Sequence, residues 1–217
     1  MDKALRFFPL DRIEDLEAEI AAALDDRSVW CRRDAIAVAL GLHGLRVGEV
    51  CRARSEDFRQ EHRRLFVRTL KGGKTRDLAL HDSVVSALAR WRIQVVSRLD
   101  HRPPWLLCSR RGNRLDPQRP QHTATAIFRR LLGPRHGLTF HALRHTFGMH
   151  LYRETGDLIL CKEMLGHSSV KTTEEFYVRN LAEVPDACLV HLGGRSMLPA
   201  ARDIPGCQLR LFNPAAG

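Results

Sequence analysis

The sequence lacks paired cysteine motifs and long apolar segments. No apolar run reaches the length of a transmembrane helix, and the first residues contain no apolar segment of the signal-peptide type. We therefore expect a cytoplasmic protein without a membrane partner. Because no two cysteines form a C-x-x-C pair, reduced core thiols are favoured over disulfides or a zinc site. The six cysteines are Cys31, Cys51, Cys108, Cys161, Cys188 and Cys207.

Acidic residues are scarce relative to basic ones. The chain has 217 residues, with 35 Lys and Arg against 25 Asp and Glu, a formal net charge of +10. This surplus predicts a polyanionic partner such as nucleic acid, although a basic surface without a partner would have the same composition. The length and the hydrophobic content of 44% are those of a globular protein with one full core.

One segment in the last third of the chain, H-A-L-R-H-T-F-G-M-H-L, has helical spacing. Leu143, Phe147 and Leu151 form an apolar stripe at intervals of four residues. His141 and Arg144 are three residues apart, so they share a different face of the same expected helix. An imidazole and a guanidinium on one face can act on the same ligand.

A second group of reactive side chains follows this helix. A short helix is expected over residues 158–165, ended by Gly166; His167 comes next and Tyr177 lies ten residues after it. Arginine grips phosphate with a planar fork, histidine transfers protons near neutral pH, and tyrosine can be a covalent nucleophile. Residues 138–177 therefore indicate a site for a phosphodiester.

The motifs H-A-L-R-H-T-F, L-G-H-S-S and T-T-x-x-x-Y resemble those of the tyrosine recombinase, or phage integrase, family. Members of that family carry, in order, an arginine, a lysine on a β-hairpin, H-x-x-R, a histidine or tryptophan, and a tyrosine. His141, Arg144, His167 and Tyr177 match the last four positions of this set.

The first arginine of the family set has a match at Arg46. Arg46 follows a Gly-containing break and starts a short expected helix with Glu49 three residues on. An arginine after a turn is commonly a surface residue, but one beside so apolar a helix needs a partner. The resemblance implies that Arg46 binds phosphate and that Glu49 orients it.

The family lysine has a match in an expected β-hairpin. Strand-like runs at residues 65–70 and 75–80 flank Lys71-Gly-Gly-Lys74. Lysines at a hairpin tip are usually only solvated. The resemblance implies that Lys71 protonates the leaving 5′-oxygen, and it assigns Lys74 to a less constrained basic position.

The expected architecture is mainly α-helical with a small antiparallel β-sheet, an α+β fold like the catalytic domain of that family. Asp11, Ser28 and Asp82 are expected to cap three of the helices. These three helices are expected over residues 11–24, 28–42 and 82–99, and a fourth is expected over residues 117–132. We expect a catalytic domain at residues 1–183. Residues 184–217 would form a Pro-broken tail that packs either on a neighbouring protomer or on its own domain.

The resemblance implies strand transfer that needs no cofactor and no metal. Arg46 and Arg144 would stabilise the charge that develops on the phosphate. His141 would accept the phenolic proton, His167 would donate to the phosphate, and Tyr177 would form a 3′-phosphotyrosyl link. The bond energy is conserved in that link, so another 5′-hydroxyl can reseal the strand.

This chemistry predicts a site-specific DNA recombinase that acts on double-stranded DNA as a homotetramer in the nucleoid, assisted by accessory DNA-bending proteins. Integration, excision and inversion fit the sequence equally. The alternatives are a type IB topoisomerase-like enzyme, which reseals the same strand, and an inactive DNA-binding protein. A zinc site at His141, His145 and His150 is disfavoured because no glutamate lies between the first two.

Basic residues outside the catalytic set are candidates for contacts with DNA phosphates. The main candidates are Lys74, Arg76, Arg110, Arg111 and Arg114. Further candidates are Arg32, Arg33, Arg52, Arg54, Arg63 and Arg64.

Two features depart from the family pattern. The interval of ten residues between His167 and Tyr177 is one longer than the family interval of nine. Nothing before Asp11 could form the helical DNA-clamping domain that usually precedes this catalytic domain. The chain is therefore expected to be either a piece of a longer recombinase or a short recombinase of the fimbrial invertase type.

Overall fold

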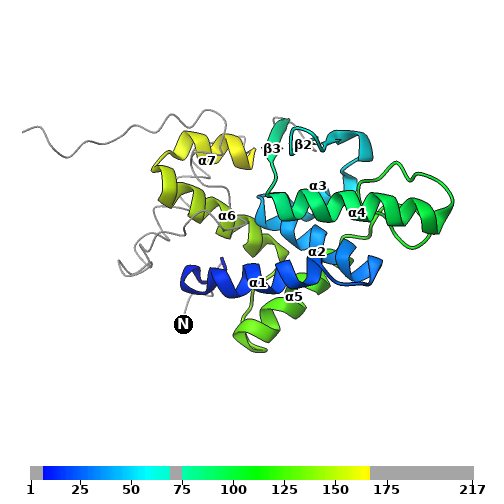
Figure 1. The fold of residues 1–217 in the computed structure, drawn as a ribbon. Coiled ribbons are helices and arrows are strands. Elements are labelled where there is room, and N and C mark those ends of the chain that lie inside the picture. The colour runs from blue at the N-terminus through cyan, green and yellow to red at the C-terminus, as the bar shows by residue number, and fades with distance from the viewer. Residues whose placement is uncertain (1–6, 69–74, 167–217) are drawn as a thin grey trace, which may run out of the picture.

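Helix α2 (Val29–Leu42) lies at the centre of the fold (Figure 1). The computed structural model describes residues 7–68 and 75–166. Five other helices, α1, α3, α4, α5 and α6, pack directly on α2. The Ala-rich sequence of α2 lets these helices approach closely. The expected cap is confirmed, because the Ser28 hydroxyl accepts a hydrogen bond from the backbone N–H of Cys31 at 3.4 Å.

The helices expected from periodicity form, with their apolar faces buried. Ile20, Trp91 and Phe147 are at most 1% exposed, and Phe147 belongs to the predicted apolar stripe. No helix in the described part of the chain is long and apolar enough to cross a bilayer. Besides α2, the elements are a 3₁₀ turn (Leu10–Arg12), α1 (Ile13–Leu24), α3 (Val47–Arg52), a second 3₁₀ turn (Ser55–Asp57), α4 (Asp82–Leu99), α5 (Gln118–Leu132), α6 (Phe140–Thr155) and α7 (Leu158–Leu165).

A small antiparallel sheet lies beside the helices, with strand order β1-β2-β3. Its strands are β1 (Phe58–Arg59), β2 (Arg64–Val67) and β3 (Arg76–Ala79). Leu65 pairs with Leu78 across β2 and β3, and both side chains are buried. The predicted α+β class is therefore confirmed. Lys71 and Lys74 lie outside the described residues.

Two predicted helix caps are wrong. Helix α1 begins at Ile13 and not after Asp11, because the three residues before it form a 3₁₀ turn. At α4 the capping side chain is His81, whose Nδ1 accepts from the backbone N–H of Ser83 at 3.3 Å. Asp82 is instead the first helical residue and pairs with Arg63 at 2.9 Å.

Arg32 and Arg33 do not belong to a phosphate-contacting surface, contrary to expectation. They are 4% and 5% exposed, because α2 is enclosed by its neighbouring helices. Arg32 Nε donates to the carbonyl of Leu24 at 3.0 Å. Arg33 pairs with Asp34 at 2.6 Å and donates to the carbonyl of Cys108 at 3.2 Å. Both arginines therefore satisfy interior groups of the fold.

The described cysteines are free thiols, and all but Cys31 lie in the core as the sequence predicted. Cys51, Cys108 and Cys161 are buried, whereas Cys31 is exposed. Burial raises the pKa of Cys51 and Cys108 to about 11, so both thiols are protonated at neutral pH.

Candidate active site

The site begins where α2 ends and α3 starts. Arg46 occupies the N-cap position of α3, and Glu49 lies three residues into the helix. The Glu49 carboxylate accepts a hydrogen bond from the Arg46 backbone N–H at 2.8 Å and one from its guanidinium at 3.1 Å. These two bonds, both donated by Arg46, fix the start of the helix, and this is the pairing that the sequence predicted.

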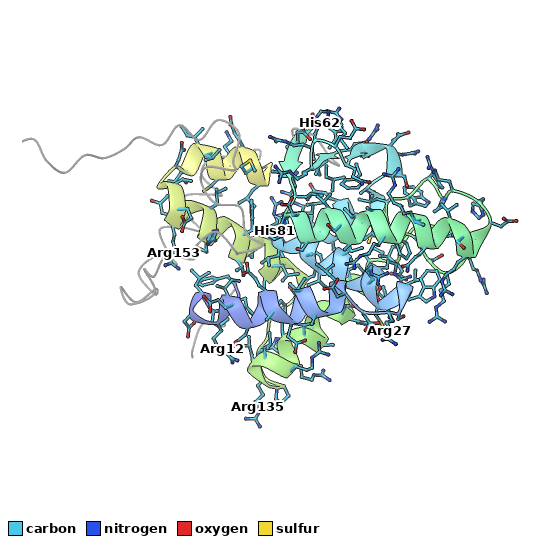
Figure 2. The ribbon with its side chains drawn as sticks, in the orientation of Figure 1. Arg12, Arg27, His62, His81, Arg135 and Arg153 are labelled. Atoms are coloured by element: carbon cyan, nitrogen blue, oxygen red, sulfur yellow. The ribbon has the colours of Figure 1, made fainter. Side chains whose placement is uncertain are left out.

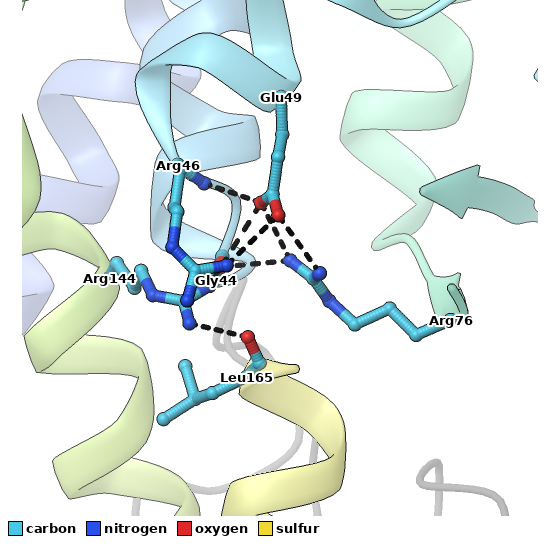
Figure 3. Close-up of polar contacts among 6 residues, drawn as sticks. All are labelled: Gly44, Arg46, Glu49, Arg76, Arg144 and Leu165. Carbon is cyan, nitrogen blue, oxygen red and sulfur yellow. Dashed lines mark hydrogen bonds and ion pairs between the residues drawn. The ribbon is translucent and has the colours of Figure 1, made fainter. Parts of the chain in front are cut away.

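Two further guanidiniums approach the same carboxylate (Figure 3). Arg76, on β3, donates from Nη1 to Glu49 Oε1 at 3.1 Å and from Nη2 to Oε2 at 2.8 Å. Arg144, on α6, places Nη1 4.0 Å from Glu49 Oε2. Residues from α3, β3 and α6 therefore meet at one acidic side chain.

Glu49 is ionised in this environment. Burial by itself would raise the pKa of the carboxyl, but the hydrogen bonds and charge of Arg76 act against it. The Arg46 backbone N–H and the charge of Arg144 act in the same direction as Arg76, and the net result is a lowered pKa. The cluster thus contains three cationic groups and one anion.

Arg144 is enclosed, with only 1% of its surface exposed. Its guanidinium donates to the backbone carbonyls of Gly44 and Leu165. These two bonds join α6 to the turn between α2 and α3 and to the end of α7 (Figure 3). Arg46 differs, because 40% of its side chain is exposed, so it presents a cation to the surface.

Gly44 is required where Arg144 meets the α2–α3 turn. Its φ of +89° lies in the left-handed region, and a Cβ atom there would come within 2.7 Å of the Phe147 ring. Any larger residue would push α6 away from the turn. The glycine therefore keeps the Gly44 carbonyl within reach of Arg144.

His141 lies exposed in the first turn of α6. The part of its ring that faces the protein is desolvated, which lowers the pKa of His141, and the charges of Arg144 and Arg46 lower it further. The imidazole is therefore neutral at pH 7 and can accept a proton. His145 packs edge-on against it, with 4.3 Å between the ring centroids.

The structure brings Arg46, Glu49 and Arg144 together as expected from the sequence. Lys71, His167 and Tyr177 lie outside the described residues. The described chain ends at Gly166, which terminates α7 in the left-handed conformation.

Arg76 was expected to face DNA, but it lies inside the site. It is 8% exposed and its guanidinium is committed to Glu49. The sequence could have predicted the burial of Arg76, because Arg76, Leu78 and Leu80 alternate with polar or small residues along the strand. The period of two places Arg76 on the buried face of β3.

Arg110, Arg111 and Arg114 are exposed on the loop that precedes α5. The Arg110 guanidinium lies 5.7 Å from the centroid of the Trp30 ring. Figure 2 shows other basic side chains on the outer surface, such as Arg27 and Arg135, which project away from the core. The loop arginines therefore remain candidates for contacts with a polyanion.

Comparison with known proteins places this geometry in context. Residues 12–183 match the model of the phage integrase family. The tyrosine recombinase XerA of Pyrococcus horikoshii is 31% identical over 174 residues, an alignment that covers 79% of this chain and 58% of the relative. The chain thus spans a little over half of that protein.

Two solved structures have a similar fold. The crystal structure of XerA recombinase aligns with a TM-score of 0.67 and 25% identity, covering 87% of this chain and 64% of that one. XerH recombinase in a post-cleavage complex with palindromic difH substrate aligns with a TM-score of 0.71 and 22% identity, covering 87% and 54%.

Proposed function

The chain belongs to the phage integrase family, and we propose that it is a site-specific recombinase that cleaves and rejoins double-stranded DNA through a phosphotyrosyl intermediate. The observation that carries the proposal is the meeting of Arg46 and Arg144 at Glu49, from helices about a hundred residues apart. Two guanidiniums at a common point suit the non-bridging oxygens of one phosphodiester.

The arginines have different tasks in this proposal. Arg46 has an exposed guanidinium and makes the first contact with the phosphate. Arg144 carries five N–H donors, and its bonds to Gly44 and Leu165 hold the group rigidly. Such preorganisation stabilises the developing charge without reorganisation during the reaction. Glu49 keeps the cluster from carrying three uncompensated positive charges.

The strand-transfer step balances with side chains alone. The Tyr177 oxygen attacks phosphorus and forms the 3′-phosphotyrosyl bond while the P–O5′ bond breaks. His141, neutral at pH 7, accepts the phenolic proton, and Lys71 gives a proton to the 5′-oxygen. His167 donates a hydrogen bond to the phosphate. Attack by a second 5′-hydroxyl reverses these steps on a new strand.

The partner in this proposal is duplex DNA, bound by a tetramer of the chain. Recombination of two duplexes needs four strand cleavages, so four protomers must act together. XerH was crystallised with its difH substrate, which supports DNA as the ligand. Accessory DNA-bending proteins would help to bring two sites together, and residues 184–217 would contact a neighbouring protomer.

The test is covalent trapping with the full chain. The DNA that flanks the gene would first be sequenced to find inverted or direct repeats. Nicked duplexes would be made from these repeats, so that the short cleaved fragment dissociates and the adduct accumulates. The unaltered chain and Tyr152→Phe should both form an adduct, because Tyr152 packs beside the core. Tyr177→Phe should form none, and an adduct that survives this change would refute the assignment.

A second measurement separates recombination from strand relaxation. A topoisomerase-like enzyme would relax supercoiled plasmids that lack the flanking repeats. The proposed recombinase would instead exchange strands between two repeat-containing duplexes and leave such plasmids supercoiled. An absence of adduct on all of these substrates would indicate a DNA-binding protein without activity.

A further inference from the structure

Arg76, like Arg144, is a buried member of the arginine cluster. Its side chain is 6% exposed and that of Glu49 is 2% exposed, so their contact is sealed from solvent. Two parallel bonds, of 3.1 Å and 2.8 Å, join the guanidinium fork to both carboxylate oxygens. A bidentate pair of this kind fixes both distance and orientation.

Arg46 and Arg76 share the carboxylate unequally. Arg46 donates a single side-chain bond at 3.1 Å and remains 40% exposed. If Arg76 were absent, Glu49 would be a buried carboxylate with Arg46 as its nearest full counter-charge. Arg46, which already makes one side-chain bond to this carboxylate, would then turn further inward and pair with both of its oxygens, since a poorly compensated buried charge is costly.

Arg76 also contacts the α2–α3 turn and the end of α7. Its Nη2 lies 3.4 Å from the Gly44 carbonyl, the same oxygen that accepts from Arg144. A Cβ atom built on Gly166 would come within 2.9 Å of Arg76 Nη1, so Arg76 packs against the residue that ends α7. Arg76 thus contacts three groups: Glu49, which pairs with Arg46, the Gly44 carbonyl, which accepts from Arg144, and Gly166 at the end of α7.

Stability alone does not account for an arginine at this position. Its Nε is buried and makes no hydrogen bond to any other described group. A buried donor without a partner is unfavourable, and apolar packing often replaces a buried ion pair without loss of stability. The arginine is better explained by the geometry that it imposes.

We propose that Arg76 is a positioning residue: it neutralises Glu49 from the buried side, so that Arg46 stays at the surface with N–H groups directed at the phosphate. This inference rests on the recombinase function proposed above. Arg76 does not touch the DNA in this proposal, and its effect on the reaction passes through Glu49.

The experiment compares Arg76→Lys and Arg76→Met with Arg33→Lys. Arg33 is the matched control, because it is also buried, is paired with an acidic residue, and belongs to α2 away from the cluster. For each full-length variant we would measure thermal stability, affinity for duplex DNA, and the rate of adduct formation on the nicked substrate.

We expect both Arg76 variants to bind DNA within about threefold of the unaltered chain while forming the adduct about 10- to 100-fold more slowly, as for a misplaced catalytic group. Arg33→Lys should lose comparable thermal stability yet keep its adduct rate. A methylphosphonate at the scissile position lacks one negative charge and depends less on Arg46. The deficit of the Arg76 variants should therefore shrink on this substrate.

A double-mutant cycle tests the route through Glu49. In a Glu49→Gln background, Arg76→Lys should cost little further rate, because the carboxylate that it positions is already gone. Arg76→Lys keeps the positive charge, so it provides the result if Arg76→Met does not fold. Adduct rates equal to the unaltered chain, equal deficits on both substrates, or additive effects with Glu49→Gln would each overturn the inference.

Failure of the function and failure of the inference give different results. If the unaltered chain forms no adduct, the recombinase proposal falls and Arg76 has no reaction to serve. If the unaltered chain forms the adduct and the Arg76 variants match the Arg33→Lys control, the recombinase proposal stands and only the positioning role is rejected.

Discussion

His43 accepts a hydrogen bond from the backbone N–H of His81, with 3.2 Å between Nε2 and that nitrogen. Its Nδ1 lies 2.8 Å from the carbonyl oxygen of Ala39, so this nitrogen carries the ring proton. The neutral imidazole thereby connects the last turn of α2 to the start of α4. Burial lowers the pKa of His43 to about 4, against a smaller opposite effect of the bond to Ala39.

Stability should therefore fall as the solution is acidified. Burial also lowers the pKa of His150 to about 4. Both histidines titrate near 6.5 in the unfolded chain, which thus binds more protons between pH 6.5 and 4. Each should cost up to about 3 kcal/mol across that window, and urea unfolding at several pH values would measure it. His43→Gln should reduce the pH dependence; an unchanged slope would contradict the pKa assigned to His43.

The leaving group should identify the catalytic lysine. A 5′-phosphorothiolate leaves as a thiolate without protonation, so it should restore cleavage by Lys71→Ala. Lys74→Ala should cleave the ordinary phosphodiester at nearly the normal rate and gain little from the sulfur. The opposite pattern, with rescue confined to Lys74→Ala, would transfer the general-acid role to Lys74.

The loop before α5 should contribute to the salt dependence of DNA binding. The variant Arg111→Gln/Arg114→Gln removes two exposed charges but leaves the contact between Arg110 and Trp30 intact. If both arginines bind phosphates, the slope of log K against log salt should become less steep by about two. Filter binding or fluorescence anisotropy at several salt concentrations would measure this change.

The control for the loop variant is Arg90→Gln/Arg130→Gln. It removes the same charge from arginines that pair with Asp25 at 2.6 Å and with Glu19 at 2.8 Å. The slope should then change little. Equal slopes for the two double variants would mean that net charge, and not the loop, determines the affinity.

The C-terminal tail should connect assembly to cleavage. Deletion of residues 184–217 should leave DNA binding nearly intact and sharply lower synapsis and recombination, because apolar segments after the tyrosine would lose their docking role on a neighbour. Gel-shift and synapsis assays on paired sites would separate these steps. Full recombination by the truncated chain would instead favour packing of the tail within its own domain.

The helices and the sheet could be predicted because their apolar residues recur with clear periods. The stripe of Leu143, Phe147 and Leu151 is buried as expected. The paired strands Arg64–Val67 and Arg76–Ala79 overlap the two predicted runs, and the first begins one residue earlier than predicted. The link between Arg46 and Glu49 could also be predicted, since three residues on a helix bring side chains together.

The environment of the arginines could not be predicted from local pattern. Arg32 and Arg33 lie on a helix that is covered on nearly every side, and only the packing of distant helices reveals this. Arg76 meets Glu49 across 27 residues of sequence. The two helix caps were wrong for local reasons. A 3₁₀ turn includes Asp11 before α1 begins, and the His81 ring takes the capping position of α4 in place of Asp82.

The enclosure of α2 also affects how the site would open during thermal fluctuation. Amide hydrogens of α2 are covered by five helices, so they should exchange with solvent only through global unfolding. Arg46 and Glu49 come directly after α2 in the chain, so they are attached to the part of the fold that unfolds last. The Leu165 carbonyl, which accepts a hydrogen bond from Arg144, lies at the end of the short helix α7. Within the described residues, the main packing partners of α7 are α6 and β3. The α7 side of the site can therefore detach and return by local unfolding while the α3 side keeps its shape.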